Sequence, residues 1–491
     1  MAKFILGIDQ STHGTKAIIF DQNGKIVKRC DAAHRQIINH LGWIEHDAHE
    51  IYKNMRKAVK NVIEAASISE RDISAIGLCN QRETIVAWDK KTQKAICNAI
   101  VWQCSRAESV CSHISEQASE VIQKNTGLPL SPYFSAAKIR WLYENNMDFQ
   151  VSANAGTLCC GTIDSWLLYC MTEGQCFKSD VSNASRTQLL NIHSLSWDDM
   201  CCKIFGIQKE WLAQIHSSSD YFGETNFNGL FERKIPIFSM LGDSQAALFG
   251  EGCHNIGDTK VTCGTGASAM MNIGCHHTLN SPMLAISVGW AIDQQPIYVL
   301  EGNINYAGAA LDWLIRDLGL IKSESEIDGY IQKSDKTDNV CFVPAFSGLG
   351  APYWQPKAKA VLSGMTRKSG KPEIIRAAVE SIAYQIADIV TEMHKVNMIH
   401  TKVLKCDGAP SRNQYMMQFL SNLLDASINV PKNDELSCIG AAYMAGIRAG
   451  IYDKNQLFSN QEYICYMPSA DEQWRQKKLM MWHQAVKKCI L

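Results

Sequence analysis

Two aspartates in this chain of 491 residues stand where a carboxylate could act on a bound substrate. Asp243 lies between a glycine and a serine in LGDSQAALFG (241–250), ahead of a run of small and apolar residues. Asp9 lies just before the turn STHGT (11–15). A carboxylate can accept a proton from an attacking hydroxyl, and a carboxylate near phosphate oxygens can hold Mg²⁺. The two residues therefore favour acid–base and metal chemistry.

Three small-residue turns could hold phosphate oxygens: STHGT, GTG (264–266) and the turn that begins at Gly408. Glycine adopts backbone conformations that expose N–H groups to an anion. A plain hairpin turn is the alternative for each of them taken singly. Together with Asp9 and Asp243, the turns predict a phosphoryl-transfer site. The sequence GxxxxGK[ST] is absent, and SAMMNIG after the GTG turn favours a strand, so neither a Walker-type loop nor a dinucleotide fingerprint is expected.

The elements that would position these residues alternate between strand and helix. Strands are expected within 4–27, 73–96 and 258–274, helices over 48–67, 106–124, 135–146 and 307–319, and a strand followed by a helix in 156–172 and 403–424. The turn near residue 9 has a counterpart near residue 264. We therefore expect a mixed α/β protein of two packed halves joined near Gly250.

The composition excludes several classes of protein. Lys and Arg number 48 and Asp and Glu number 49, so no basic surface for nucleic acid or an anionic membrane is indicated. The first residues do not resemble a signal peptide, and no run of about 18 apolar residues is found. The 19 cysteines are scattered without a CxxC pair, which favours a reduced, cytoplasmic location and a role as small buried hydrophobes.

Several long stretches resemble the FGGY family of carbohydrate kinases, and within it the glycerol kinases. They are CNQRETIVAWD (79–89), NAIVWQCSR (98–106), SNASRTQLLNIHSLSWDD (182–199) and FSGLGAPYWQP (346–356). Both family signatures are present in form, as YFSAAKIRWLYEN (133–145) and AVLSGMTRKSGKPEIIRAAVE (360–380). The resemblance covers Phe4 to about Lys488. It implies two actin-like (ribonuclease H-like) α/β domains with an active-site cleft between them: residues 1–248 on the substrate side and residues 249–491 on the nucleotide side.

The same resemblance implies roles for individual residues, with ATP and Mg²⁺ as cofactors. Asp243 would be the catalytic base, and Asp9 and Asp243 would serve the metal. The residues implied for the substrate are Arg82, Glu83, Trp102, Tyr133, Asp243, Ser244 and Ser268. Those implied for the nucleotide are Thr12, His13, Gly264, Thr265, Gly266, Gly308, Gly408 and Asn413. Arg and Glu side chains suit adjacent hydroxyls, and Trp and Tyr rings cover C–H faces.

Two positions depart from the glycerol kinase pattern. Ser244 stands where those enzymes typically have glutamine, and Ser268 stands where they typically have phenylalanine. Both changes remove bulk and add a hydroxyl. The prediction is therefore ATP-dependent phosphorylation of a small polyol or sugar larger than glycerol. Glycerol kinase proper, which makes glycerol 3-phosphate, is the alternative, and an actin-like or Hsp70-like ATPase is a remote one. The expected partner is a small-molecule polyol or sugar substrate, with no nucleic acid and no membrane. A homo-oligomer is left open, because the sequence does not give the oligomeric state.

Overall fold

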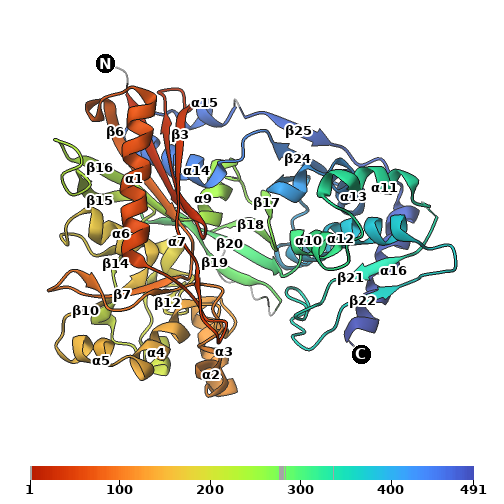
Figure 1. Cartoon of the computed structure of the whole chain (residues 1–491), viewed down its shortest axis with the longest axis horizontal. Helices are drawn as coiled ribbons and strands as arrows, with labels where there is room; N and C mark the ends of the chain where they lie inside the picture. Colours follow the sequence, from red (N-terminus) through yellow and green to blue (C-terminus); the bar gives the residue numbers. More distant parts are fainter. Residues whose placement is uncertain (1–2, 276–280, 282, 336, 460, 491) are drawn as a thin grey trace. The chain divides into compact units, whose positions relative to one another are not determined.

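The computed structural model of the chain describes residues 3–275, 281, 283–335, 337–459 and 461–490. These residues form two compact units, each assembled from several segments (Figure 1). The first comprises Met1–Gly252, Ile286–Tyr298 and Glu435–Asn460; the second comprises Cys253–Ala285, Val299–Asp434 and Gln461–Leu491. The first unit thus includes a segment from late in the chain, and the division into 1–248 and 249–491 stays a prediction. None of the described helices is long and apolar enough to cross a membrane.

The first unit is built on a mixed sheet with the strand order β19-β15-β16-β6-β1-β2-β3. Its strands are β1 (Phe4–Gln10), β2 (Gly14–Phe20), β3 (Ile26–Ala33), β6 (Ile73–Asn80), β15 (Ser219–Thr225), β16 (Ile235–Gly242) and β19 (Ala285–Ile292). Strand β1 pairs antiparallel with β2 and parallel with β6, and β6 pairs parallel with β16. Helix α1 (Ala48–Ala66) packs on β2 and β3, while α14 (Leu436–Arg448) packs on β1, β6 and β16.

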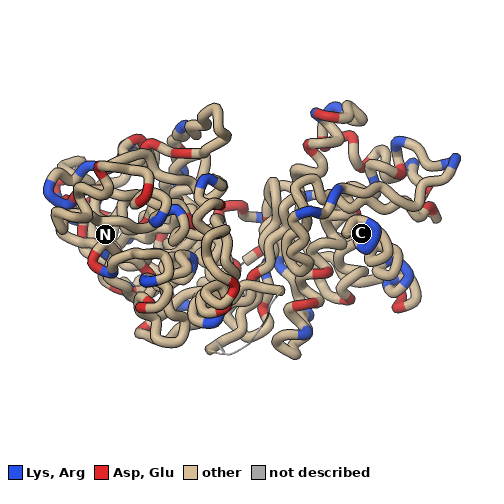
Figure 2. Tube along the Cα trace, turned by 90° about the horizontal axis from the view of Figure 1, so that it is seen from below, with Lys and Arg blue, Asp and Glu red and all other residues tan. Residues whose placement is uncertain are grey.

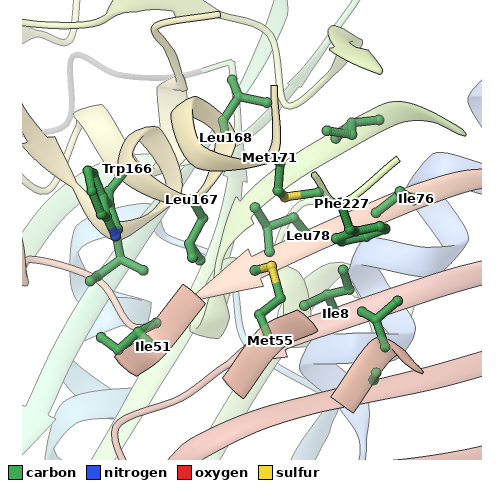
Figure 3. Packing of buried hydrophobic residues seen from close by; sticks show 14 of the residues in the cluster. Ile8, Ile51, Met55, Ile76, Leu78, Trp166, Leu167, Leu168, Met171 and Phe227 are labelled. Atoms are coloured by element: carbon green, nitrogen blue, oxygen red, sulfur yellow. The ribbon is translucent and has the colours of Figure 1, made fainter. Parts of the chain in front are cut away.

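The hydrophobic core beside this sheet follows from the spacing of apolar residues in its strands and helices. Alternate residues of a strand share one face of a sheet, and residues three or four apart share one face of a helix. Figure 3 shows the result: Ile8, Ile76 and Leu78 of the strands meet Ile51 and Met55 of α1, together with Trp166, Leu167, Leu168, Met171 and Phe227. Helix α6 (Ile163–Met171) supplies four of these residues.

A second, antiparallel sheet in the first unit has the strand order β10-β7-β9-β5-β4, with β8 paired to β7. It comprises β4 (Ile37–Ile38), β5 (Ile44–His46), β7 (Ile85–Asp89), β8 (Lys94–Ala95), β9 (Ala99–Ile100) and β10 (Leu158–Thr162). Other helices of this unit include α4 (Ser135–Asn145), α5 (Met147–Asn154), α7 (Val181–Ala184), α8 (Asp199–Phe205) and α9 (Asp243–Gly250).

The helix expected over 106–124 is broken into two. Helix α2 (Glu108–Ser112) ends at His113, and α3 (Glu116–Thr126) begins after Ser115. The hydroxyl of Ser115 accepts a hydrogen bond from the N–H of Ala118 at 3.3 Å and so caps the new helix. The spacing of apolar residues does not reveal such a cap, so the sequence predicts one helix where the structure has two.

The second unit repeats the pattern of the first with the strand order β25-β24-β23-β17-β18-β20. Its strands are β17 (Thr259–Cys263), β18 (Ala267–Gly274), β20 (Gln295–Ile304, which belongs to this unit from Val299 on), β21 (Cys341–Val343), β22 (Val361–Ser363), β23 (Val403–Asp407), β24 (Ser427–Pro431) and β25 (Tyr463–Tyr466). Its helices include α10 (Gly308–Arg316), α11 (Ile327–Lys333), α12 (Lys371–Asn397), α13 (Gln414–Leu424) and α16 (Glu472–Ile490). Strands β17 and β18 form a hairpin, β17 pairs parallel with β23, and β23 pairs parallel with β24.

The hairpin β17–β18 therefore corresponds to β1–β2, and β23 and β24 correspond to β6 and β16. This duplicated arrangement confirms the α/β fold class. It also confirms that the strand–turn–strand pattern near residue 9 is repeated near residue 264. Charged residues of both signs are interspersed along the trace of each unit (Figure 2). Twelve of the nineteen cysteines are buried, as small apolar side chains would be.

Candidate active site

The parallel strands of the first unit bring three charged residues to one edge of its sheet. Asp9 of β1 pairs with Cys79 of β6, and Gly242 at the end of β16 pairs with Asn80 at the end of β6. Arg82 follows β6 by two residues, and Asp243 follows β16 directly. Ligands of α/β sheets bind beyond the carboxyl ends of the strands. The sequence could suggest Asp9 and Asp243 one by one, but the strand register places them at one edge.

Asp9 is buried and lacks a full set of partners. Its side chain is 8% exposed, and its Oδ1 accepts no hydrogen bond from any described residue. Burial raises the pKa of the Asp9 carboxyl to about 6, and the charges of Asp243 and Glu435 raise it too, while Lys16 opposes the rise. Lys16 Nζ lies 4.0 Å from Asp9 Oδ2 and donates to Glu435 Oε2 at 2.9 Å. A buried oxygen without a donor is a place where a cation would fit.

Asp243 is the first residue of α9 and is held by its neighbours. Arg82 Nε lies 3.3 Å from Asp243 Oδ1, and the Ser244 N–H donates to the same oxygen at 2.7 Å. The Ser244 hydroxyl also donates to it, at 3.2 Å. The Asp243 side chain is 34% exposed, whereas that of Arg82 is 6% exposed. Arg82 is thus fixed within the protein, while Asp243 keeps a face from which it could reach a ligand.

Glu83 adopts an unusual backbone conformation beside this ion pair. Its φ is 59°, in the left-handed region that residues other than glycine rarely visit. The hydroxyl of Ser135 donates to its backbone oxygen at 3.1 Å, and Arg186 Nε donates to its Oε1 at 2.6 Å. The side chain is 2% exposed. Glu83 is therefore held from both its backbone and its carboxylate, and strained conformations of this kind persist only where the surroundings enforce them.

Two aromatic residues predicted for the substrate lie next to each other. The rings of Trp102 and Tyr133 meet edge to face with their centroids 5.6 Å apart. The indole Nε1 of Trp102 donates to Thr12 Oγ1 at 3.0 Å, which joins this pair to the β1–β2 turn. His13 in the same turn is exposed. Trp102 and Tyr133 thus form one connected group with the first phosphate-type turn.

The glycine turns of the second unit are likewise gathered at the ends of β17 and β23. The Gly308 N–H donates to Gly264 O at 2.9 Å, and Thr265 O accepts from the N–H groups of Ala307 and Ala309 at 2.9 and 3.0 Å. A Cβ added at Gly408 would lie 1.9 Å from Cys263 O, and φ at Gly408 is 89°. Only glycine fits there, because both the space and the backbone angle exclude a side chain. Gly264 and Thr265 are exposed, whereas Gly266 is half-buried.

Asn413 and Ser268, also in the second unit, have structural partners already. The Asn413 carboxamide caps α13 by accepting from the Met416 N–H at 2.8 Å, and its Nδ2 donates to Asp328 Oδ1 at 2.9 Å. The Ser268 hydroxyl donates to Glu301 Oε1 at 3.2 Å, and Glu301 is 1% exposed. The hydroxyl protons of both Ser268 and Ser244 are therefore donated to carboxylates within the protein.

The two carboxylates at the sheet edge of the first unit, Asp9 and Asp243, suit a Mg²⁺ ion that a phosphate substrate also helps to bind. Within the described residues, no group of three or more His, Cys, Asp or Glu could hold a metal ion. Mg²⁺ on a phosphate substrate commonly uses only one or two protein carboxylates, with phosphate oxygens and water completing its octahedron. Asp9, with its unpartnered Oδ1, and the partly exposed Asp243 fit that demand.

Four residues beside the site were not predicted: half-buried Lys16 and buried Glu435, Arg186 and Lys138. Lys16 follows the STHGT turn directly, so a cation beside Asp9 could have been found from its position in the sequence. Arg186 and Lys138 lie within stretches 182–199 and 133–145, which carried the resemblance without assigning them a role. Nothing in the sequence connects Glu435 to Lys16, because 419 residues separate them.

The chain matches two protein-family models over most of its length. Residues 4–250 match the N-terminal domain, and residues 259–449 the C-terminal domain, of the FGGY family of carbohydrate kinases. The chain is 42% identical over 490 residues to "Glycerol kinase 1" of Thermotoga maritima, covering 99% of both chains. It is 40% identical over 495 residues to the glycerol kinase of Natranaerobius thermophilus, covering 100% of this chain and 99% of the other.

Solved structures agree with these relatives. The glycerol kinase of Plasmodium falciparum, solved with ADP, superposes with a TM-score of 0.93 at 35% identity, covering 100% of this chain and 99% of that one. The gluconate kinase of Lactobacillus acidophilus has a TM-score of 0.89 at 19% identity, covering 99% of this chain and 98% of that one. The second match supports the fold alone.

Proposed function

Because this chain belongs to the FGGY family of carbohydrate kinases, we propose that it transfers the γ-phosphoryl group of ATP to a hydroxyl of glycerol. The observation that carries the proposal is the Arg82–Asp243 ion pair at the carboxyl ends of β6 and β16, with Glu83 held beside it. An acceptor alcohol needs a base for its proton and donors and acceptors for its other hydroxyls. This group of side chains offers both.

In the proposed reaction Asp243 is the base. Its carboxylate accepts the proton of the attacking hydroxyl as the new oxygen–phosphorus bond forms. The bond between the γ-phosphorus and the bridging oxygen breaks, and ADP leaves with that electron pair. Arg82 holds Asp243 Oδ1 at 3.3 Å and so fixes the orientation of the base. The transfer moves a phosphoryl group and a proton and requires no oxidant or reductant.

The acceptor would be held by Arg82 and Glu83 and covered by Trp102 and Tyr133. The guanidinium donates hydrogen bonds and the carboxylate accepts them, so adjacent hydroxyls can each find a partner. The edge-to-face rings would cover the carbon-bound hydrogens and exclude water, which otherwise competes for the phosphoryl group.

The nucleotide would be held chiefly by backbone. In this proposal the turns at Thr12–His13 and Gly264–Gly266 bind phosphate oxygens, and Gly308, Gly408 and Asn413 lie toward the nucleoside. Asp9 and Asp243 would hold Mg²⁺, which neutralises phosphate charge when it is bound. Asp9 would do so with Oδ1, which accepts no hydrogen bond from the described residues.

Glycerol is favoured over the larger acceptor expected from Ser244 and Ser268. The relatives at 40–42% identity over the full length are named glycerol kinases. The structure adds a physical reason: the two serine hydroxyls already donate to Asp243 and Glu301, so their protons are committed within the protein. A larger polyol or sugar is the second candidate, supported by the bulk that these serines remove.

A substrate panel tests the proposal. ATP-dependent phosphorylation should be measured on glycerol, erythritol and the pentuloses, with the product identified by mass and by NMR. We expect the highest kcat/KM with glycerol and a product phosphorylated at a terminal carbon. A higher kcat/KM with an acceptor of four or more carbons would establish the second candidate. ATP hydrolysis that no acceptor stimulates would instead support an actin-like or Hsp70-like ATPase.

A further inference from the structure

A buried cluster beneath the acceptor residues takes no part in the chemistry above. It comprises Arg186, Lys138 and Phe134, which follow α7, lie within α4 and precede α4 respectively. The side chains of Arg186 and Lys138 are fully buried, and Phe134 is 5% exposed. The Arg186 guanidinium carbon lies 5.1 Å from the centre of the Phe134 ring. Two cations buried this completely require an explanation.

Arg186 acts on the carboxylate of Glu83. Its Nε donates to Glu83 Oε1 at 2.6 Å, and both side chains are withdrawn from water. Arg82 Nε lies 3.9 Å from the same oxygen. The contact therefore sets the direction of a carboxylate whose backbone is already held in the left-handed region.

Lys138 acts on the backbone that carries Tyr133. Its ammonium group donates to the carbonyl oxygens of Pro132 at 2.8 Å, of Phe134 at 3.2 Å and of Tyr133. An ammonium group has three N–H donors, and three consecutive carbonyls accept them. Burial lowers the pKa of Lys138 to about 7, and the charge of Glu83 opposes this fall. Both cations thus interact with Glu83, one directly and one at longer range.

We propose that Arg186 and Lys138 are positioning residues for the acceptor: Arg186 fixes the carboxylate of Glu83, and Lys138 fixes the loop that carries Tyr133. The proposal rests on the proposed function, since it needs Glu83 and Tyr133 to contact the acceptor. A core that only had to be stable would not need these charges, because apolar side chains of similar volume stabilise a buried site equally well or better. Fixed geometry at a bound hydroxyl is what the charges supply.

The experiment compares Arg186→Lys, Lys138→Gln and Glu83→Gln, each assayed for the KM of glycerol, the KM of ATP and kcat. Arg140→Lys is the matched control, since Arg140 lies on the same α4 and pairs at the surface with Glu144. Thermal unfolding of every variant reports on folding. We expect Arg186→Lys and Lys138→Gln to raise the KM of glycerol by about 10-fold or more, because small displacements of a positioning group are costly. The KM of ATP should change less than about 2-fold, and the control should match the parent.

The double variant Glu83→Gln with Arg186→Lys separates positioning from a merely structural role. If Arg186 acts through Glu83, its substitution adds little once Glu83 is changed, so the two effects on the KM of glycerol do not multiply. Multiplying effects, or equal rises in the KM of glycerol and of ATP, would overturn the proposal. If Arg186→Lys does not fold, Lys138→Gln carries the test with the same readouts; failure of both to fold would assign the cluster to stability and overturn the proposal as well.

The outcome for Glu83→Gln alone distinguishes this inference from the proposed function. An unchanged KM of glycerol in Glu83→Gln would remove Glu83 from the acceptor site, and the proposed function would lose that contact. A raised KM in Glu83→Gln together with parental values in Arg186→Lys and Lys138→Gln would leave the function standing and reject the positioning role.

Discussion

The two units use the same strand pattern but equip its strand ends with different chemical groups. In the first unit, Asp9 lies one residue before the end of β1, Arg82 two residues after β6 and Asp243 directly after β16, so charged side chains lie at this edge. In the second unit, the corresponding strands β17 and β23 lead directly into the GTG turn and Gly408, so glycine backbone predominates there, with one carboxylate, Asp407, at the end of β23. The first arrangement fits the proposed acceptor site, and the second fits the proposed nucleotide site.

This difference decides what a substitution does. A side-chain site fails when a charge or proton acceptor is removed, and the fold around it can survive. A backbone site fails where an added Cβ would collide with a neighbouring carbonyl oxygen, as it would at Gly408. The variants below test this contrast, with the largest expected effect first.

Removing the base should have the largest effect. Asp243→Asn keeps the shape of the side chain and removes the proton acceptor, so kcat should fall by about 10²–10⁴-fold. Asp199→Asn is the control, because the Asp199 side chain is 91% exposed on α8 and should leave kcat unchanged. Steady-state kinetics with saturating ATP and glycerol provide the measurement. A parental kcat in Asp243→Asn would assign the base elsewhere.

Adding one methyl group to the backbone site should be next. Gly408→Ala places a Cβ 1.9 Å from Cys263 O at a φ of 89°, so we expect the free energy of unfolding to fall by about 2–4 kcal/mol. The KM of ATP should rise more than that of glycerol. Gly264→Ala is the matched control, since its nearest neighbour would be 3.7 Å away, and its stability should stay within about 0.5 kcal/mol of the parent.

The two glycine variants also separate folding from binding. If Gly264→Ala folds normally and still loses ATP affinity, the exposed turn contacts the nucleotide through its backbone. Parental stability in Gly408→Ala, measured by urea denaturation, would contradict the steric account of the second unit.

Neutralising Asp9 should stabilise the protein while removing activity. Its pKa of about 6 in the folded protein lies above the ordinary 3.8, so the folded state loses stability as pH rises from about 4 through 6. Asp9→Asn should therefore raise the free energy of unfolding by on the order of 2–3 kcal/mol at pH 8 and by little at pH 4. Asp31→Asn, on exposed β3, is the control and should change it by less than about 0.5 kcal/mol.

Denaturation curves at pH 4, 6 and 8, without metal or nucleotide, supply the measurement. A constant difference between parent and Asp9→Asn across this range would show that the Asp9 carboxyl does not titrate near pH 6. Turnover at the parental rate in the same variant would take Asp9 out of the metal site.

Refilling the two serine positions should have the smallest effect. Ser268→Phe combined with Ser244→Gln restores the side chains that the glycerol kinase pattern has there, and it should favour glycerol over erythritol by about 10-fold more than the parent does. Ser268→Ala with Ser244→Ala is the control, which removes the hydroxyls without adding bulk. An unchanged ratio of kcat/KM for the two acceptors would mean that neither serine contacts the acceptor.

Much of the fold could be predicted because the local patterns agree with the tertiary structure. The helix expected over 48–67 is α1, and the hairpin expected in 258–274 is β17–β18. Both could be predicted because apolar residues recur every 3.6 residues in a helix with one buried face and every second residue in a strand. The break at Ser115 was missed because a cap depends on one hydroxyl rather than on a period. The small-residue turns and the two aspartates likewise lie at or next to strand ends, where the site is proposed.

The sequence by itself determined which residues could do chemistry: carboxylates beside small residues, glycines where backbone must be exposed, and the long stretches shared with a kinase family. Only the tertiary structure decided which of them lie together. It paired Asp243 with Arg82 and placed Glu435 beside Lys16 across 419 residues, and it left Asp9 Oδ1 buried without a partner. The physical reason is that pKa, burial and ion pairing depend on distance in space, which strand register and helix packing fix and which separation along the chain does not encode.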